Sequence, residues 1–311
     1  MTASDLDSQL GVAAGTCLAR NGVATRYFAR EDETASRMAA CAVTKALEAA
    51  EVRATELDAI LLSGVMSEQP MPSTAILVHR LLGCRAAGVT CFDLNASCVG
   101  FLKGMETAAA SIQSGLWKRV AVVAVEIASK GLRWDDLDTC TLFGDGAAAF
   151  IFEPAAQDQG ILASNSVTLS EGAELCQMRA GGSRFNVRTP PPAFDDYLFS
   201  MRTRPLLRLV QQHFPKFLNE AIAGAATLGV TIKLVVPHQA SSVGLAFLRR
   251  ELAPHNLPAI DILAEFGNQV SVSIPCALHH AICRGLLRRG DTALLVATAA
   301  GVTLNSVLLR Y

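Results

Sequence analysis

The amino-acid sequence predicts an α/β protein made of two duplicated halves. Two observations lead to this prediction: strand-like and helix-like segments alternate along the chain, and segments of the first half recur in the second. With 311 residues, the chain is long enough for two modest domains or one large two-part core. We expect the first half to span residues 1–155 and the second to span residues 156–311.

The recurrence is clearest around two apolar strands. AAASIQSGLWKRVAVVAV in the first half resembles LHHAICRGLLRRGDTALLVA in the second, with Ile112 aligned to Ile282. Cys98 lies 14 residues before Ile112, and Asn268 lies 14 residues before Ile282. The cysteine and the asparagine therefore occupy equivalent positions in the two halves.

A second pair of segments extends the duplication upstream. KALEAAEVRATELDAILLSG resembles EAIAGAATLGVTIKLVVPHQ, and this register places His238 opposite Ser63, just past a short apolar strand. The copies lie 170 to 175 residues apart. That spacing is far longer than the period of about 20–50 residues in solenoid repeats, so it indicates a duplicated domain.

Helices and strands alternate in the first half. We expect elements at 34–50 (helix), 58–64 (strand), 73–82 (helix), 89–94 (strand), Cys98 to about Ser114 (helix) and 119–126 (strand). This order implies parallel strands with covering helices. The strands are apolar at consecutive positions, as expected when both faces of a sheet are covered. A five-layered α/β/α/β/α stack, with a helical layer between two sheets, would bury them.

Two further segments stand out. The helix that begins near Cys98 is rich in Ala and Gly and carries little charge, so two sheets can enclose it, with Cys98 on its first turn. The segment 181–200, GGSRFNVRTPPPAFDDYLFS, contains three successive prolines. It predicts an irregular loop that leads into a helix at 203–224.

Composition and charge exclude several classes of protein. The formal net charge of −1 gives no electrostatic basis for binding nucleic acid or an anionic membrane. The apolar runs are shorter than the roughly 20 residues of a membrane helix, and no secretory signal is visible. Nine cysteines without CxxC spacing favour neither a disulfide framework nor a metal site. A reducing cytoplasm is the simplest location.

Cys98 is the candidate nucleophile. A thiol at a helix N-terminus faces unpaired N–H groups and the positive end of the helix dipole, so we expect its pKa to be lowered. The alternative is that Cys98 is an inert buried residue, as most free cysteines are. Its equivalence to Asn268 and its position between a strand and a helix favour the nucleophile.

His238 and Asn268 are candidates to act with the thiol. His238 follows a β-branched run, at the carboxyl end of a strand, where α/β sheets place catalytic groups. Asn268 follows a glycine and starts a helix, so a cap or turn role is an alternative that is also compatible with catalysis. The remaining histidines are assigned structural or solvated roles: His79, His213, His255, His279 and His280. Together, a thiol, an imidazole and a carboxamide suit acyl transfer through a thioester.

Five motifs carry a family resemblance over nearly the whole chain. They are LNASCVGFLKG around Cys98, LFGDGAAAFIFE from Leu142, VVPHQAS around His238, GNQVSVSIPCAL around Asn268, and the closing AAGVTLNSVLLRY. In this order and spacing they resemble the β-ketoacyl-acyl-carrier-protein synthase III family of the thiolase superfamily. The resemblance implies the thiolase fold, with the cysteine in the first half and the histidine and asparagine in the second.

The resemblance also implies a reaction. Cys98 would take an acyl group from a coenzyme A or acyl-carrier-protein thioester. Malonyl-acyl carrier protein would then lose CO2, and its carbanion would attack the acyl group. His238 and Asn268 would stabilise the enolate oxygen, and the backbone N–H groups of Cys98 and Ala300 would hold the acyl oxyanion. Neither a cofactor nor a metal is implied. The expected partners are acyl carrier protein and a second copy of the chain, with no nucleic acid or membrane.

Substrate-binding positions depart from the family pattern. The resemblance implies that Arg20, Met71 and Ser241 bind substrate, with Met71 reaching into the acyl pocket of the dimer partner. Ordinary interface packing is an equal alternative for Met71. Thr16 and Leu137 replace the two side chains that stack on the adenine of coenzyme A in the family, which favours a carrier-protein donor or a coenzyme A held by its pantetheine arm.

Two departures concern the backbone. The strand that usually opens the family's chain has no counterpart before ASDLDSQL. Either this strand is missing, which would leave a sheet position empty, or the start of the chain was assigned late. The glycine run before the last strand reads Ala299, Ala300 and Gly301. An alanine keeps the N–H donor of the oxyanion hole where the backbone angles are allowed to it.

Two alternative functions remain open. One is an acyltransferase of specialised metabolism that passes the acyl group from Cys98 to a non-malonyl acceptor. Asn268 argues against it, because simple transfer has no decarboxylation step to stabilise. The other is a non-catalytic partner subunit, which would be expected to lack the cysteine.

Overall fold

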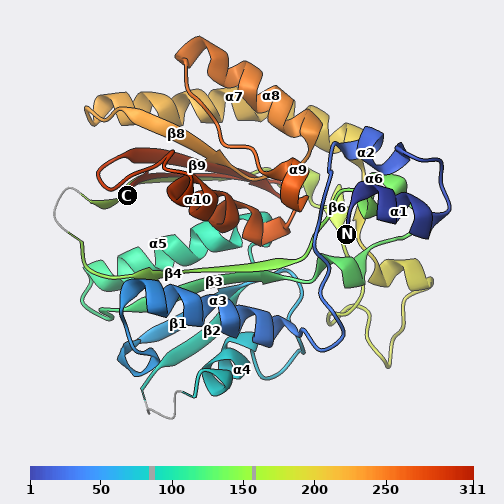
Figure 1. The fold of residues 1–311 in the computed structure, drawn as a ribbon, viewed down its shortest axis with the longest axis horizontal. Coiled ribbons are helices and arrows are strands. Elements are labelled where there is room, and N and C mark those ends of the chain that lie inside the picture. The colour runs from blue at the N-terminus through green and yellow to red at the C-terminus, as the bar shows by residue number, and fades with distance from the viewer. Residues whose placement is uncertain (84–87, 156–158) are drawn as a thin grey trace.

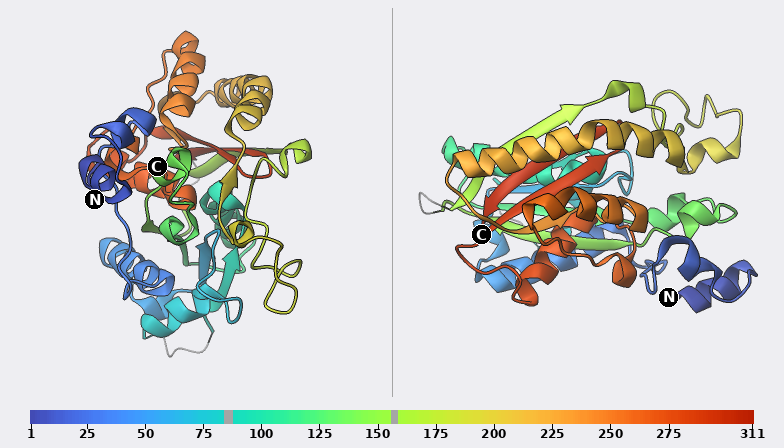
Figure 2. Two further views of the ribbon diagram at one scale, coloured as in Figure 1. Left: turned by 90° about the vertical axis from the view of Figure 1, so that its right-hand side faces the viewer. Right: turned by 90° about the horizontal axis from the view of Figure 1, so that it is seen from above.

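The computed structural model describes residues 1–83, 88–155 and 159–311. Its helices and strands form five layers, α/β/α/β/α, as the sequence predicts (Figure 1). Two sheets enclose a central helical layer, and further helices cover the outer face of each sheet. Side views show the same layering, with the segment 181–200 projecting from the body of the molecule (Figure 2).

The first sheet contains the strands of the N-terminal half in the order β2-β1-β3-β4. Their bounds are β1 Ala59–Ser63, β2 Thr90–Leu94, β3 Val120–Glu126 and β4 Gly146–Phe152. β1 pairs in parallel with both β2 and β3, and β4 runs antiparallel to β3. The parallel strands confirm the prediction made from the alternating pattern.

The second sheet repeats this arrangement in the order β5-β10-β9-β8. Its strands are β5 Gly160–Thr168, β8 Ile232–Pro237, β9 Thr292–Ala299 and β10 Thr303–Arg310. β8 and β9 are parallel, like β1 and β3, and β10 is antiparallel to β9, like β4 to β3. The sheets thus confirm the duplication. The expected division at residue 155/156 abuts residues 156–158, which lie outside the described residues.

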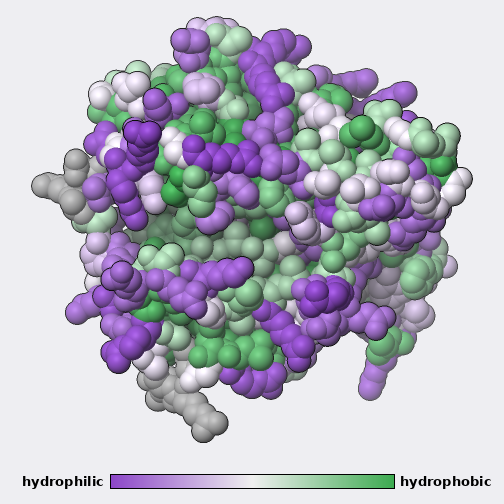
Figure 3. Space-filling view, viewed as in Figure 1, coloured by the Kyte–Doolittle hydropathy of each residue, from purple (hydrophilic) through white to green (hydrophobic). Residues whose placement is uncertain are grey.

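One sheet position is empty in the first half. β10 pairs with β5 on its outer side, but within the described residues no strand pairs with the equivalent side of β4. The sequence predicts this gap from the missing first strand. The space-filling view shows hydrophobic surface between the two sheets on the face where β4 and α10 lie, bordered by hydrophilic side chains (Figure 3).

The helices follow the layers. α3 (Ala35–Ala50) and α4 (Thr74–Leu81) cover the first sheet, α5 (Gly100–Gln113) and α10 (Ser273–Cys283) form the central layer, and α7 (Thr203–Thr227) and α8 (Ser242–Leu252) cover the second sheet. Among the described residues, none of the helices is long and apolar enough to cross a membrane. The described elements of the 181–200 segment are a single 3₁₀ turn, Phe194–Tyr197, and the start of β7 (Ser200–Met201), which pairs with β6 (Cys176–Gln177).

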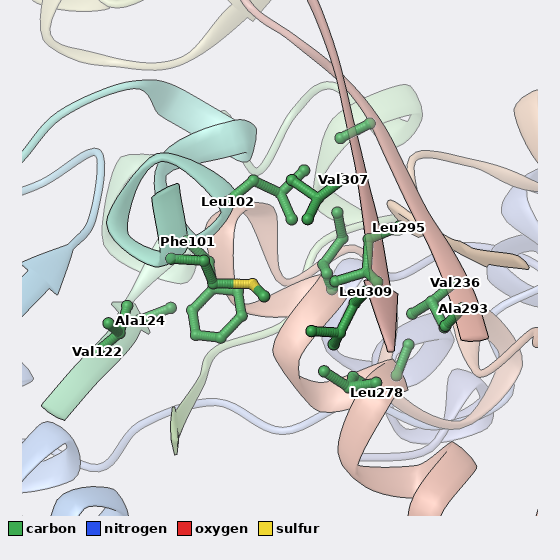
Figure 4. Close-up of a cluster of buried hydrophobic side chains, with 14 of the residues drawn as sticks. Phe101, Leu102, Val122, Ala124, Val236, Leu278, Ala293, Leu295, Val307 and Leu309 are labelled. Atoms are coloured by element: carbon green, nitrogen blue, oxygen red, sulfur yellow. The ribbon is translucent and has the colours of Figure 1, made fainter. Parts of the chain in front are cut away.

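The central helix α5 is buried between the two sheets (Figure 4). Phe101 and Leu102 are fully buried at its N-terminal end, among apolar residues of both sheets. Gly104 allows the helix to approach β3 closely, because a Cβ there would lie 2.6 Å from Cγ1 of Val122. The low charge and the small residues of this helix are therefore explained by its burial between the sheets and its close approach to β3.

The N-terminal segment packs on the second half of the chain. It contains α1 (Ala3–Leu10) and α2 (Thr16–Asn21), which lie beside α6 (Leu137–Cys140). The N–H of Ala24 donates to the carbonyl of Ala264 in α9 (Leu263–Phe266), and Val23 packs with Leu263. The two halves are therefore joined by more than their shared helical layer.

Candidate active site

Cys98 lies in a 3₁₀ turn, Ser97–Val99, between β2 and α5. The sequence predicts Cys98 on the first turn of an α-helix, but α5 begins two residues later, at Gly100. Ser97 has a left-handed backbone, with φ of 50°. This turn packs against the end of β9 and against a second 3₁₀ turn, Val270–Val272.

The resting thiol is protonated, and the expected lowering of its pKa is wrong. Burial, together with the nearby Cys176 and Glu126, raises the pKa of Cys98 well above its ordinary value. The backbone N–H groups of Cys98 and Ala300 act in the opposite direction but are outweighed. Removal from water therefore dominates over the local N–H dipoles at this site.

The two oxyanion-hole donors that the sequence predicts do meet at the thiol. The N–H groups of Cys98 and Ala300 both act on the sulfur of Cys98. Gly301, not Ala300, takes the positive φ of 128°, so the alanine has no strained backbone angle. Two backbone donors beside one thiol can stabilise negative charge on a carbonyl oxygen bound there.

His238 directly follows β8 and is buried. Its backbone N–H donates to the carbonyl of Val296 at 2.9 Å. Within the described residues, Nδ1 of its imidazole has no hydrogen-bond partner. Burial lowers the pKa of His238 to about 4, so the imidazole is neutral at neutral pH. The carboxamide of Gln239 fastens this loop by donating to the carbonyl of Pro237 at 2.9 Å and accepting from the N–H of Ile262 at 2.9 Å.

The carboxamide of Asn268 is held at both ends. Its Nδ2 donates to the carbonyl of Ala240 at 3.0 Å, and its Oδ1 accepts from the N–H of Val270 at 2.8 Å. The second bond confirms the turn role that the sequence allows. Because Nδ2 carries two hydrogens, one remains for a substrate oxygen.

These contacts bring the three predicted segments together. Asn268 is bonded to the loop that follows His238, the turn after Asn268 packs on the turn of Cys98, and Ala300 lies at the thiol of Cys98. The backbone of Asn268 is clamped as well, donating to Leu142 and accepting from Gly144. The LFGDG motif therefore supports the asparagine.

Glu126 belongs to the same region and was missed in the sequence. It ends β3, is 3% exposed and accepts hydrogen bonds from the N–H of Val65 and the hydroxyl of Ser271. Burial raises the pKa of its carboxyl to about 7. The signal was available, because an acid at the carboxyl end of an apolar strand occupies the kind of position that drew attention to His238.

The three predicted substrate-binding residues lie on three different segments, of which the end of α2 approaches the start of α8, because a Cβ at Gly22 would lie 3.7 Å from Cβ of Ser242. Arg20 in α2 forms an ion pair with Asp138 at 2.5 Å. Met71, in the loop between β1 and α4, is 82% exposed. Ser241 is the N-cap of α8, where its hydroxyl accepts from the N–H of Gly244 at 3.0 Å.

Two hollows adjoin the site. A groove of about 400 Å³ opens beside the Cys98 turn, lined by Asn95, Ala96, Ser97, Val99, Lys103, Ser166, Thr168, Ala300 and Thr303. A smaller, mainly apolar cavity of about 60 Å³ lies between His238 and the helices α7 and α8. Ala300, which the resemblance assigns to the oxyanion hole, therefore borders open space.

Comparisons with known proteins agree over the whole chain. The family model of 3-oxoacyl-[acyl-carrier-protein (ACP)] synthase III matches residues 92–170, and its C-terminal model matches residues 226–311. The β-ketoacyl-[acyl-carrier-protein] synthase III of Symbiobacterium thermophilum is 33% identical, over 100% of this chain and 94% of that protein. The enzyme of the same name from Aquifex aeolicus is 32% identical, over 100% and 95%.

Solved structures show the same architecture. The crystal structure of 3-oxoacyl-[acyl-carrier-protein] synthase III from Aquifex aeolicus superposes with a TM-score of 0.85 at 31% identity, covering 100% of this chain and 95% of that one. That from Thermus thermophilus gives 0.86 at 27% identity, with the same coverage. The duplicated five-layered fold is therefore the thiolase fold that the sequence predicts.

Proposed function

The chain belongs to the 3-oxoacyl-[acyl-carrier-protein] synthase III family, and from this membership and the site geometry we propose that it condenses an acyl primer with malonyl-acyl carrier protein. The primer is loaded on Cys98, and the product is a β-ketoacyl thioester. The observation that carries this proposal is the pair of backbone donors at a buried thiol, beside a carboxamide fastened to the histidine loop.

Loading begins from a protonated thiol. The proton of Cys98 has to leave as the sulfur attacks the thioester carbonyl, and a neutral imidazole at His238 is able to accept it. The N–H groups of Cys98 and Ala300 then stabilise the tetrahedral oxyanion. When this intermediate collapses, the carrier sulfur leaves with the proton that His238 accepted, and the imidazole is neutral again.

Condensation creates negative charge at a different oxygen. When malonyl thioester loses CO2, the charge moves to its thioester oxygen, which the free N–H of Asn268 and the imidazole of His238 stabilise. The carbanion then attacks the acyl carbonyl on Cys98 and releases the thiolate. The backbone N–H groups of Cys98 and Ala300 thus serve the acyl oxyanion, and the side chains of Asn268 and His238 serve the enolate oxygen. Simple acyl transfer forms no enolate and does not require the second set of donors.

For the donor, we propose an acyl-carrier-protein thioester or a coenzyme A thioester held by its pantetheine arm. Arg20 is engaged by Asp138, and Thr16 and Leu137 offer no stacking surface for adenine. No separate cofactor takes part in this reaction scheme.

Loading of Asp138→Asn by acyl-coenzyme A should improve if the ion pair withholds Arg20, while loading from acyl carrier protein stays unchanged.

We also propose a cytoplasmic homodimer. β2 pairs with β1 on one side, and within the described residues its other side is unpaired, which makes it a template for a second chain. The exposed loop of Met71 lies in the connection from β1 and would gain a partner there. Free cysteines such as the exposed Cys41 and Cys283 are consistent with a reducing compartment.

Intact-mass spectrometry tests the function. The chain, incubated with acyl-carrier-protein and acyl-coenzyme A donors, should gain one acyl mass, and Cys98→Ala should gain none. Addition of malonyl-acyl carrier protein labelled at the free carboxyl should then release labelled CO2. An acyl-enzyme that releases no CO2 but passes its acyl group to an alcohol or amine points to the acyltransferase instead. A chain that never loads is a non-catalytic subunit.

A further inference from the structure

A buried carboxylate lies beside the nucleophile and has no part in the reaction described above. Glu126 is 3% exposed at the end of β3. Its two oxygens lie 3.0 and 3.2 Å from the N–H of Val65, and Oε1 accepts from the hydroxyl of Ser271 at 2.7 Å. The backbone of Ser271 also lowers the pKa of this carboxyl, against the larger upward effect of burial.

Burying the carboxylate of Glu126 costs folding free energy. A carboxylate loses most of its hydration when it is buried, and an apolar residue at the end of an apolar strand would avoid that cost. Within the described residues, no lysine or arginine forms an ion pair with Glu126. Hydrogen bonds alone therefore stabilise it, and these bonds come from two loops of the active site.

The positions of its two hydrogen-bond donors, Ser271 and Val65, show which segments Glu126 holds together. Ser271 lies three residues after Asn268, in the 3₁₀ turn that packs on the turn of Cys98. Val65 lies in the loop that follows β1. The carboxylate thus joins β3, the loop after β1 and the segment that carries the asparagine.

We propose that Glu126 is a positioning residue for the condensation step, because its carboxylate holds the Asn268 segment in place through Ser271. This inference rests on the proposed function. A carboxylate can accept at both oxygens, whereas a carboxamide of the same shape accepts at only one. Ser271 donates to Oε1, and the N–H of Val65 lies within 3.2 Å of both oxygens, so a glutamine that keeps its oxygen at Ser271 would turn its NH2 group toward Val65 and loosen the contact.

The charge of Glu126 adds a second consequence. The titratable groups that face its carboxyl are Cys98 from the 3₁₀ turn and Asp145 from the segment before β4. The loop after β1 and the turn of Ser271 contribute only uncharged donors. A negative charge at Glu126 opposes the ionisation of Cys98.

The experiment compares Glu126→Gln, Ser271→Ala and the double variant. Acyl loading is followed by intact mass, condensation by CO2 release, and the ionisation of Cys98 by the pH dependence of its alkylation by iodoacetamide. Ser129→Ala is the matched control, because it removes a 2.6 Å bond between a serine and the carboxylate of another buried acid, Asp145, which contacts the Asn268 segment through its backbone carbonyl, at Gln269, and not through this carboxylate.

We expect Glu126→Gln to lower condensation about tenfold and Ser271→Ala several-fold, with loading within about twofold of the unsubstituted protein. The double variant should be no worse than Glu126→Gln, since both act through one contact. The midpoint of alkylation should fall by about half a pH unit to one unit in Glu126→Gln, because a nearby negative charge is removed. Ser129→Ala should leave the ratio of condensation to loading unchanged.

Two results each overturn the proposal: equal loss of loading and condensation, or additive effects of the two substitutions. An unmoved alkylation midpoint contradicts the second consequence, the effect of the Glu126 charge on Cys98. If Glu126→Gln does not fold, Ser271→Ala tests the proposal. Its ratio of condensation to loading is then compared with the same ratio in Ser129→Ala. If the unsubstituted protein loads but releases no CO2, the proposed function itself fails. The alkylation midpoint then still decides whether Glu126 acts on Cys98.

Discussion

Cys98 and His238 carry opposite pKa shifts that have one cause. Burial raises the pKa of the thiol and lowers the pKa of the imidazole to about 4, so both groups are neutral in the resting protein. A site without a standing thiolate and imidazolium pair develops charge only when substrate arrives. Preorganised N–H donors then matter more than a charged partner.

Asn268→Ala separates the two chemical steps. Loading should survive within about threefold, because the oxyanion donors at Cys98 and Ala300 are backbone groups. Condensation should fall about 100-fold, the range measured when one oxyanion donor is removed elsewhere. Mass spectrometry of the acyl-enzyme and CO2 release measure the two steps. Equal damage to both would count against the assigned role of Asn268.

Glu126 gives folding stability a specific pH dependence. Its pKa of about 7 in the folded protein lies above the ordinary value of 4.5, so the proton-linked stability is fully present below about pH 4.5 and is lost as pH rises through 7. Asp145, whose pKa burial also raises, contributes in the same direction. Glu126→Gln should therefore lose less stability than the unsubstituted protein between pH 5 and 8.

Urea unfolding at both pH values measures this difference, which we expect to be on the order of 1–3 kcal/mol. The comparison uses the change between the two pH values within each protein, so any hydrogen bond lost in the variant cancels. An identical pH dependence in both proteins would show that Glu126 does not titrate in this range.

At the scale of elements, the ends of strands place the chemistry. His238 follows β8, Ala300 follows β9, and Glu126 ends β3, each at the carboxyl end of its strand. The sequence pattern located the elements expected in the first half to within two residues, since apolar runs mark the strands. It did not show that Cys98 belongs to a 3₁₀ turn, because a single turn is too short for 3.0 and 3.6 residues per turn to give different sequence patterns.

Two glycines in helices should respond in opposite directions to alanine. In α5, a Cβ at Gly104 would lie 2.6 Å from Cγ1 of Val122, a buried and stiff β-branched side chain. Gly104→Ala should therefore destabilise the protein by about 1–3 kcal/mol. In α7, a Cβ at Gly224 meets nothing within 4 Å, and Gly224→Ala should stabilise by about 0.5–1 kcal/mol.

Thermal or urea unfolding of the two variants measures both signs. Gly224→Ala serves as the control for the intrinsic helix preference of alanine, which is common to both substitutions. A stabilised Gly104→Ala variant would mean that α5 moves away from β3 at little cost, contrary to the close packing of the central layer.

At the scale of the whole molecule, each large sheet ends in two edge strands, which in the described part of the chain are β2 and β4 in the first sheet and β5 and β8 in the second. Light scattering after size exclusion should give about twice the 32.9 kDa of one chain, since the β2 edge can pair with its copy. A monomer that still condenses would remove the dimer from the proposal.

The family resemblance in the sequence predicts the three site residues, Cys98, His238 and Asn268. The sequence by itself determined the fold class, the duplication and the parallel direction of the strands. These follow from periodicity and from residue types, which are local properties of the chain.

Only the tertiary structure decided the charge states and the contacts across the site. The thiol pKa moves upward, against the local expectation, because desolvation depends on which layers close over Cys98. The ion pair of Arg20 with Asp138 and the bond of Ser271 to Glu126 join residues more than 100 positions apart. Such pairings are set by the packing of whole layers and leave no periodic signal in the sequence.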